Sequence, residues 1–263
     1  MAGLTDKALV RERFRRTLGS YSDEAVVQKA MAGELVSMAA RHAPSIRFER
    51  VLEVGSGSGV LTEQMLEAFS IARYTANDLV EESRECLKRI MDRHLEVVFD
   101  FLGGDVESLP FLPEQSDLVV SNATLQWLDD LDAFFGRIRE SMAPGGLFVF
   151  TSFSSSNMQE IAALLGTALS YRTMAETREL GERHFEVLEL REAEITLTFS
   201  SPEAVLRHIS RTGVNGLNRE RWTKGMQREF SDRYRSMFSR QEGVGLTYHP
   251  VYCCLRKREG CPL

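Results

Sequence analysis

The sequence predicts an α/β protein with a doubly wound, mainly parallel seven-stranded sheet, N-terminal helices and a helical insertion before the last strand. Short apolar runs alternate with helical stretches between residues 51 and 153, which is typical of βαβ units. The first run ends abruptly at a cluster of glycines, and two later strand-like runs enclose a polar segment. We therefore expect one domain in four parts: helices over 1–44, a core over 45–200, an insertion over 201–245 and a last strand over 246–257.

The first part of the chain holds the alternating elements. We expect helices over 5–19 and 23–42, with Asp23 as the N-cap of the second helix and Pro44 directly after its end. Apolar runs then predict strands at 51–54, 74–77, 97–102, 118–121 and 147–153, separated by helices at 60–69, 81–93 and 131–142. Strands that alternate with helices in this way form a parallel sheet.

The pattern changes after Phe153. We expect a helix at 157–169, a long strand at 185–199, helices at 202–212 and 218–240, and a final strand at 246–255. The last two strands would pair antiparallel, with residues 201–243 inserted between them. The sequence contains no repeat and no low-complexity linker, so the insertion is expected to belong to the same domain.

Composition and charge exclude several classes of protein. Hydrophobic residues make up 43% and charged residues 27% of the chain, which is an ordinary globular balance. The net charge of −6 disfavours nucleic-acid binding, because that needs clustered lysine and arginine. Residues 11–16 (RERFRR) stand where an export signal would be apolar, and no apolar run reaches the roughly 20 residues of a membrane span. We expect a cytoplasmic monomer that binds no membrane.

The four cysteines predict neither a disulfide nor a metal site. Cys86, Cys253, Cys254 and Cys261 form no C-x-x-C pair, and no histidine lies at a metal-ligand spacing from them. A disulfide between the adjacent Cys253 and Cys254 would be strained. We therefore expect reduced thiols and no metal.

The strongest signal is the glycine-rich turn Val51-Leu52-Glu53-Val54-Gly55-Ser56-Gly57-Ser58-Gly59. Glycines between a strand and a helix let a ligand approach the backbone at the carboxyl edge of the sheet. A dinucleotide fingerprint would need a small residue where Val60 stands, and a phosphate-binding loop would need a lysine. The carboxylate of Glu53 suits a zwitterionic sulfonium ligand and would repel a pyrophosphate. Alone, the turn could also serve packing only.

Polar residues at the following strand ends strengthen the ligand interpretation. Asp78 ends the second strand, where a carboxylate can bind both hydroxyls of a ribose, and Asp105 ends the third, where it can accept from an adenine amino group. Asn122 and Ala123 end the fourth strand. Each could be an ordinary solvated loop residue. Polar groups at four successive strand ends instead predict one ligand site.

Residues 48–153, including the Pro144-Gly145-Gly146 turn, resemble the class I S-adenosylmethionine (SAM) dependent methyltransferases. The resemblance implies that SAM is the cofactor and S-adenosylhomocysteine its product. It also implies that Glu53 and Gly55 lie against the methionine part, Asp78 against the ribose and Asp105 against the adenine. The full set of expected cofactor-binding residues is Tyr21, Gln28, Glu53, Gly55, Ser56, Gly57, Asp78, Leu79, Asp105, Val106, Asn122 and Ala123.

Three further pieces resemble the malonyl-acyl-carrier-protein O-methyltransferases of biotin synthesis. They are Phe14-x6-Tyr21-x6-Gln28, the run from Ser121 to Trp127, and Leu246-Thr247-Tyr248-His249. The resemblance implies that Tyr21 and Gln28 lie on a lid helix over SAM, and that the methyl acceptor is the free carboxylate of a malonyl thioester. Trans-aconitate methyltransferases share the middle piece, so another small carboxylic acid stays an alternative acceptor. A non-enzymatic SAM-binding protein is a third alternative.

A carboxylate acceptor fits the residues at the strand ends. It is already ionised at pH 7 and needs alignment and desolvation, and no His–Asp pair that could act as a base stands out there. The rigid fork of an arginine would hold such a group, and Arg172 is our candidate, although it could be an ordinary surface residue. The expected catalytic residues are Tyr21 and Arg172, and the expected substrate-binding residues are Gln126, Trp127, Arg172 and His249.

Structural roles for the same residues stay open. Tyr21 could be a helix-junction aromatic, Trp127 a core residue and His249 a hydrogen-bonded strand histidine.

The insertion carries an excess of basic residues. Between 201 and 240 nine lysines and arginines face four aspartates and glutamates, although the whole chain is acidic. A basic surface beside the active site would attract an acidic acyl-carrier protein. A merely solvated helical face is the alternative, and coenzyme A remains possible as the acyl carrier.

Overall fold

The computed structural model describes residues 6–166, 171–211 and 223–260, except for the side chains of Thr17 and residues 19–24. Its centre is a seven-stranded sheet in the order β3-β2-β1-β4-β5-β10-β6. All neighbouring pairs are parallel except those that β10 makes with β5 and β6, so the expected sheet is confirmed. In sheet order the strands are β3 (Val98–Gly103), β2 (Ser70–Asp78), β1 (Arg47–Val54), β4 (Ser116–Ser121), β5 (Met142–Phe153), β10 (Pro250–Arg256) and β6 (Glu186–Glu192).

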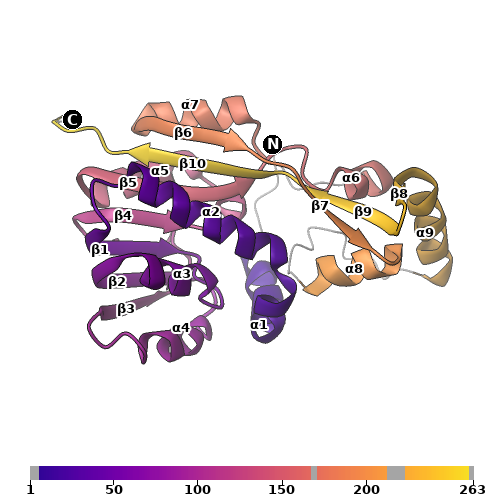
Figure 1. The fold of residues 1–263 in the computed structure, drawn as a ribbon, viewed down its shortest axis with the longest axis horizontal. Coiled ribbons are helices and arrows are strands. Elements are labelled where there is room, and N and C mark those ends of the chain that lie inside the picture. The colour runs from indigo at the N-terminus through magenta and orange to yellow at the C-terminus, as the bar shows by residue number, and fades with distance from the viewer. Residues whose placement is uncertain (1–5, 167–170, 212–222, 261–263) are drawn as a thin grey trace.

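Alternating apolar side chains let the central strands bury both faces of the sheet. Leu147 and Val149 of β5 pack on one face, and Phe148 and Phe150 pack on the other. The first face is covered by α2 (Val26–His42), α3 (Val60–Ala68) and α4 (Ser83–Met91), and the second by α5 (Leu131–Ser141) and α7 (Met174–His184) (Figure 1). Cys253 and Cys254 likewise point to opposite faces, and both are buried and free.

Two N-terminal helices precede the sheet, as expected. The first, α1 (Lys7–Glu24), stands across the carboxyl edge of the strands, and α2 packs on the sheet (Figure 1). The expected cap was wrong: Asp23 lies inside α1, and α2 begins after Ala25 without any side-chain cap. Aspartate is a common N-cap residue, but here α1 continues five residues beyond the predicted end at residue 19 and includes Asp23.

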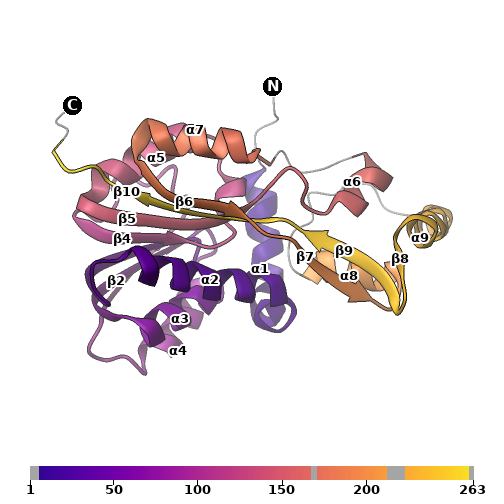
Figure 2. The same ribbon diagram turned by 45° about the horizontal axis from the view of Figure 1, so that its top comes forward.

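The two long C-terminal strands are each divided between two sheets. The run 185–199 forms β6 and β7 (Ile195–Phe199), and the run 246–255 forms β9 (Gly243–Tyr248) and β10, with His249 at the break. β7, β9 and the short β8 (Ser239–Arg240) make a second, three-stranded sheet. The antiparallel pairing was correct, but the single long strands were wrong. Figure 2 shows both ribbons running from the central sheet into the outer part of the molecule.

The outer part, which we call the outer lobe, consists of the second sheet with α6 (Gln159–Leu165), α8 (Pro202–Arg211) and α9 (Lys224–Phe238). Its interior holds buried polar contacts: His208 Nε2 lies 2.8 Å from the Tyr248 hydroxyl, and the Tyr234 hydroxyl donates to the Gly245 carbonyl at 2.7 Å. The helix predicted at 202–212 is confirmed for the described residues, and the one predicted at 218–240 is confirmed as α9 over 224–238, whereas residues 239–240 form β8 instead.

Helix α7 was not predicted. It begins with a capping box, in which Thr173 accepts from the Glu176 amide and the Glu176 carboxylate accepts from the Thr173 amide. The pattern Thr-x-x-Glu was a visible start signal in the sequence. None of the helices that the structure describes is long and apolar enough to cross a membrane.

Candidate active site

One cavity lies at the carboxyl ends of β1, β2, β3 and β4, between the sheet and the two N-terminal helices. Eleven of the twelve expected cofactor residues line it, all except Tyr21, whose side chain lies outside the described part of the chain. The lining residues named by the sequence are Gln28, Glu53, Gly55, Ser56, Gly57, Asp78, Leu79, Asp105, Val106, Asn122, Ala123 and also Trp127. Five distant sequence segments therefore converge on one space.

The glycine turn has a backbone that other residues rarely adopt. Gly55 and Gly57 have φ values of 76° and 52°. A Cβ atom on Gly55 would lie 2.1 Å from Thr124 Oγ1, so this glycine is needed for the close approach of the turn to the loop after β4. A Cβ atom on Gly57 would meet nothing within 4 Å, and Gly57 is the position that leaves the backbone open to a ligand.

Asp78 connects the end of β2 to the glycine turn. Its carboxylate accepts from the Gly57 amide at 2.6 Å and from the Val80 amide at 2.8 Å. The residue is 8% exposed, and burial raises the pKa of its carboxyl above the usual 3.8 while these backbone hydrogen bonds lower it. Asp78 thus fixes the turn while its carboxylate lines the cavity.

Glu53 is the most deeply buried carboxyl group of the cavity. Its Oε2 atom accepts from the Thr62 hydroxyl at 2.5 Å and from the Tyr74 hydroxyl at 2.7 Å. Burial raises the pKa of Glu53 to about 7; the two hydroxyl donors lower it, and the charge of Asp78 raises it further. A cationic ligand in the cavity would favour the ionised form, because an opposite charge offsets the desolvation.

Asn122 joins the end of β4 to the N-terminal helices. Its amide donates to the Gln28 carbonyl at 3.0 Å, and its Oδ1 accepts from the Thr151 hydroxyl at 2.6 Å. Thr151 in turn accepts from the Ala123 amide at 2.9 Å. Helix α2 is therefore attached to the cavity floor at Gln28, whose side chain is 3% exposed.

The cavity also holds buried polar atoms that suit a polar ligand. Among the described residues, Ser56 Oγ, Ser58 Oγ and Trp127 Nε1 are buried without a hydrogen-bond partner, and all three residues line the cavity. Buried polar atoms are normally paired. Together with the carboxylates of Glu53, Asp78 and Asp105, these atoms fit a nucleoside that carries an amino acid and a positive charge, as SAM does.

Three expected substrate residues do not line this cavity. Gln126 lies near it: its amide donates to the Ala123 carbonyl at 2.7 Å, and its Oε1 is 3.5 Å from the Ser152 hydroxyl. Arg172 is exposed directly before α7, where its charge acts on Asp132 and Glu176. His249 lies at the break between β9 and β10. Their roles toward a substrate, like that of Tyr21, stay predictions.

A histidine–carboxylate pair that the sequence did not reveal lies at this break. His249 Nδ1 is 3.2 Å from Glu192 Oε1, and the same carboxylate accepts from the Ser154 hydroxyl. His249 Nε2 is buried and has no partner among the described residues. Glu192 and His249 are far apart in sequence, and only the pairing of β6 with β10 brings them together.

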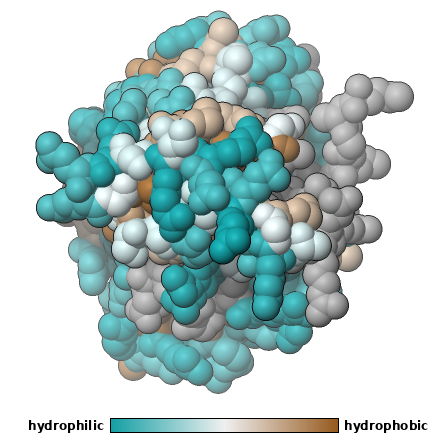
Figure 3. Space-filling view, turned by 90° about the vertical axis from the view of Figure 1, so that its right-hand side faces the viewer, coloured by the Kyte–Doolittle hydropathy of each residue, from teal (hydrophilic) through white to brown (hydrophobic). Residues whose placement is uncertain are grey.

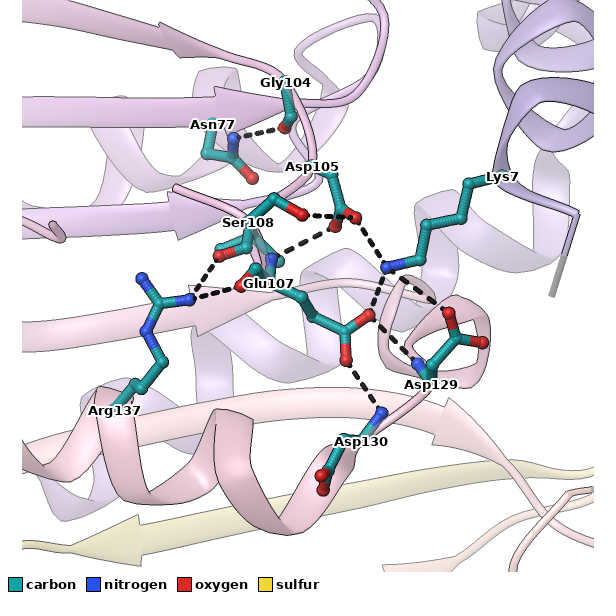
Figure 4. A network of polar contacts seen from close by, with 10 residues as sticks. Lys7, Asn77, Gly104, Asp105, Glu107, Ser108, Asp129, Asp130 and Arg137 are labelled. Atoms are coloured by element: carbon teal, nitrogen blue, oxygen red, sulfur yellow. Dashed lines mark hydrogen bonds and ion pairs between the residues drawn. The ribbon is translucent and has the colours of Figure 1, made fainter. Parts of the chain in front are cut away.

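A second residue that sequence reasoning missed is Lys7. It lines the cavity from α1, and its ammonium lies 2.7 Å from Asp105 Oδ2 (Figure 4). Nothing in the local sequence distinguishes Lys7 from a solvated helix residue, because its partners come from loops about 100 residues later.

Comparison with known proteins gives a consistent set of similarities. A family model described as "Methyltransferase domain" matches residues 52–150. A malonyl-[acyl-carrier protein] O-methyltransferase of Chlorobium luteolum is 84% identical, over 98% of this chain and 98% of the relative. Proteins of the same name from Chlorobium phaeovibrioides and Bacteroides thetaiotaomicron are 57% and 34% identical, over 98% and 97% of this chain and 100% and 99% of theirs.

Solved structures share the fold at low sequence identity. A putative methyltransferase from Bacillus halodurans has a TM-score of 0.63 at 16% identity, over 85% of this chain and 98% of that one. Phosphoethanolamine N-methyltransferase 2 of Haemonchus contortus, solved with S-adenosyl-L-methionine, has a TM-score of 0.52 at 16% identity, over 86% of this chain and 52% of that one.

Proposed function

The chain belongs to the family of malonyl-[acyl-carrier protein] O-methyltransferases, and on this premise we propose that it methylates the free carboxylate of a malonyl thioester on acyl-carrier protein. The cofactor is SAM. The observation that carries the proposal is the 84% identity to a relative of that name over nearly the whole of both chains. The reaction would make a methyl ester, as the biotin pathway implied by the sequence resemblance requires.

SAM supplies an electrophilic methyl group on a sulfonium. For this chain we propose that Glu53 lies against the cationic methionine part, Asp78 against the ribose and Asp105 against the adenine edge. All three residues line the cavity, which supports this order. A malonyl carboxylate is ionised at neutral pH, so the protein has to position and desolvate it rather than remove a proton.

The acceptor is tested directly by incubating the protein with methyl-labelled SAM and malonyl-acyl-carrier protein, malonyl-coenzyme A or trans-aconitate. We expect a base-labile methyl ester on the carrier protein, with slower transfer to coenzyme A. Preferred labelling of trans-aconitate would contradict the malonyl assignment. Absence of transfer to all three by a protein that binds SAM would contradict the enzymatic proposal.

We also propose that the outer lobe receives the acyl-carrier protein. The described basic residues of α8 and α9 are exposed, and Figure 3 shows that this end of the molecule is largely hydrophilic. Arg235 forms ion pairs with Glu203 at 3.4 Å and Asp232 at 4.0 Å, so part of the positive charge of this surface is neutralised locally. The exposed basic residues of α8 and α9 are Arg207, Arg211, Lys224, Arg228, Arg233 and Arg235, and β8 adds Arg240.

If charge attracts the carrier protein, turnover of malonyl-acyl-carrier protein should fall steeply as salt is raised. Exposed charges are screened at a distance of about 8 Å at physiological ionic strength. A small malonyl thioester analogue should respond much less, because it does not need the lobe. The kcat/KM of both substrates over a NaCl series provides the measurement, and equal salt dependence would indicate a merely solvated surface.

A further inference from the structure

An ammonium group in the first turn of α1 lies at the rim of the cofactor cavity. Lys7 Nζ contacts three carboxylates, those of Asp105 at 2.7 Å, Asp129 at 3.7 Å and Glu107 (Figure 4). Asp105 and Glu107 belong to the loop after β3, and Asp129 belongs to the loop before α5. One side chain therefore joins three segments that come from different parts of the chain.

Backbone amides of the two loops hold the carboxylates of Asp105 and Glu107 in place. Glu107 accepts from the backbone amides of Asp129 and Asp130 at 3.0 and 2.8 Å, and Asp105 Oδ1 accepts from the Glu107 amide at 3.1 Å. Arg137 donates to the carbonyls of Val106 and Glu107 at 2.9 and 2.8 Å. The loops thus form a rigid base beneath the helix (Figure 4).

Partial burial makes these ion pairs matter more than ordinary surface pairs. The side chain of Lys7 is 22% exposed, and those of Asp105 and Glu107 are 22% and 15% exposed. Burial alone would lower the pKa of Lys7, but its hydrogen bonds to Asp105 and Glu107 outweigh this effect and the pKa is raised. Without Lys7, the carboxylates of Asp105 and Glu107 would lose the ammonium group that lies between them.

We propose that Lys7 is a positioning residue that holds α1 closed over the adenine end of the cavity and fixes the carboxylate of Asp105. Lys7 lies on the cavity wall, and Phe14, two turns further along α1, packs edge-on against Trp127 at 5.7 Å. The helix can leave the rim only when the Lys7 contacts break. On this proposal, the ion-pair cluster slows cofactor exchange by holding α1 at the rim. The inference rests on the proposed function for the identity of the cofactor.

The test is the rate at which bound, labelled SAM leaves the protein when chased with unlabelled SAM. Lys7→Met should leave α1 unanchored and accelerate dissociation roughly tenfold, the usual effect of losing a charge-assisted hydrogen bond. Lys7→Arg keeps the charge and should restore most of the residence time. The matched control is Arg16→Met, which removes a charge from the exposed side of the same helix, where Arg16 contacts Glu12, and should leave the rate unchanged.

The outcomes separate the possible failures. An unchanged dissociation rate in Lys7→Met would overturn the inference, while a wild-type protein that does not bind SAM would overturn the proposed function instead. Thermal unfolding without SAM shows whether each variant folds. If Lys7→Met does not fold, the same measurement is made on the wild-type protein at increasing salt. SAM should dissociate faster as NaCl is raised from about 0.05 to about 0.5 M, because salt screens the ion pairs. A salt-independent rate would again overturn the inference.

Discussion

Replacing Asp78 with alanine should weaken SAM binding by about 1.5–3 kcal/mol, or roughly 10- to 150-fold, the range for hydrogen bonds to charged groups. The side chain has two tasks that the substitution removes together. In the proposed binding mode it would accept from the ribose hydroxyls, and it accepts from the Gly57 amide at 2.6 Å, which fixes the glycine turn. Isothermal titration calorimetry with SAM measures the loss.

Two variants make the Asp78 result interpretable. Asp78→Asn keeps an oxygen that can accept from Gly57 but loses the charge, so its affinity should lie between those of wild type and Asp78→Ala. Asp92→Ala removes an exposed aspartate at the end of α4 and should bind SAM normally. Unchanged affinity in a folded Asp78→Ala protein would refute the assignment of the cofactor site.

The affinity for SAM should rise about tenfold between about pH 5.5 and about pH 7.5, because the pKa of Glu53 lies at about 7 in the cofactor-free protein. A raised pKa means that the folded protein holds this proton below pH 7. A cationic cofactor binds better to the ionised carboxylate, so binding expels the proton and becomes tighter as pH increases. Calorimetry across this pH range measures the effect.

Glu53→Gln should remove this pH dependence and bind SAM weakly at every pH, since glutamine carries no charge.

The rate of methyl transfer in a single turnover, measured with saturating SAM, should stay level from about pH 6 to about pH 8, because the acceptor has no proton to lose. A rise of that rate near pH 7 would contradict a carboxylate acceptor. It would direct attention to the pair formed by His249 and Glu192 as a base.

The parallel core and most of the cofactor cavity were predictable because their signals are local. Gly55 and Gly57 stand where a strand turns into a helix, and Asp78 and Asp105 follow strand ends, so all of them meet at the edge of a parallel sheet. Any chain that forms βαβ units brings such residues together. The identity of the ligand came from residue chemistry and from a resemblance, not from the fold.

The parts that were missed depend on long-range packing. The mostly polar residues 191–194 and the pair His249-Pro250 interrupt the apolar runs 185–199 and 246–255 where each run changes sheets. Such short polar segments also occur within single strands, so they did not by themselves predict a second sheet. The contacts of Lys7 with Asp105 and of His249 with Glu192 join distant segments. Asp23 is a residue type typical of an N-cap, but helix α1 continues through it to Glu24.

The place of β10 in the sheet has a consequence for how the protein is synthesised. β10 lies between β5 and β6, although residues 250–256 are translated after both. At roughly 5–20 residues per second, the ribosome completes β6 several seconds before the strand that attaches it to the sheet. During that interval the edge of β5, with Phe148 and Phe150, is open to pairing with another chain. Aggregation of the newly made protein is therefore most probable just before its last strand emerges.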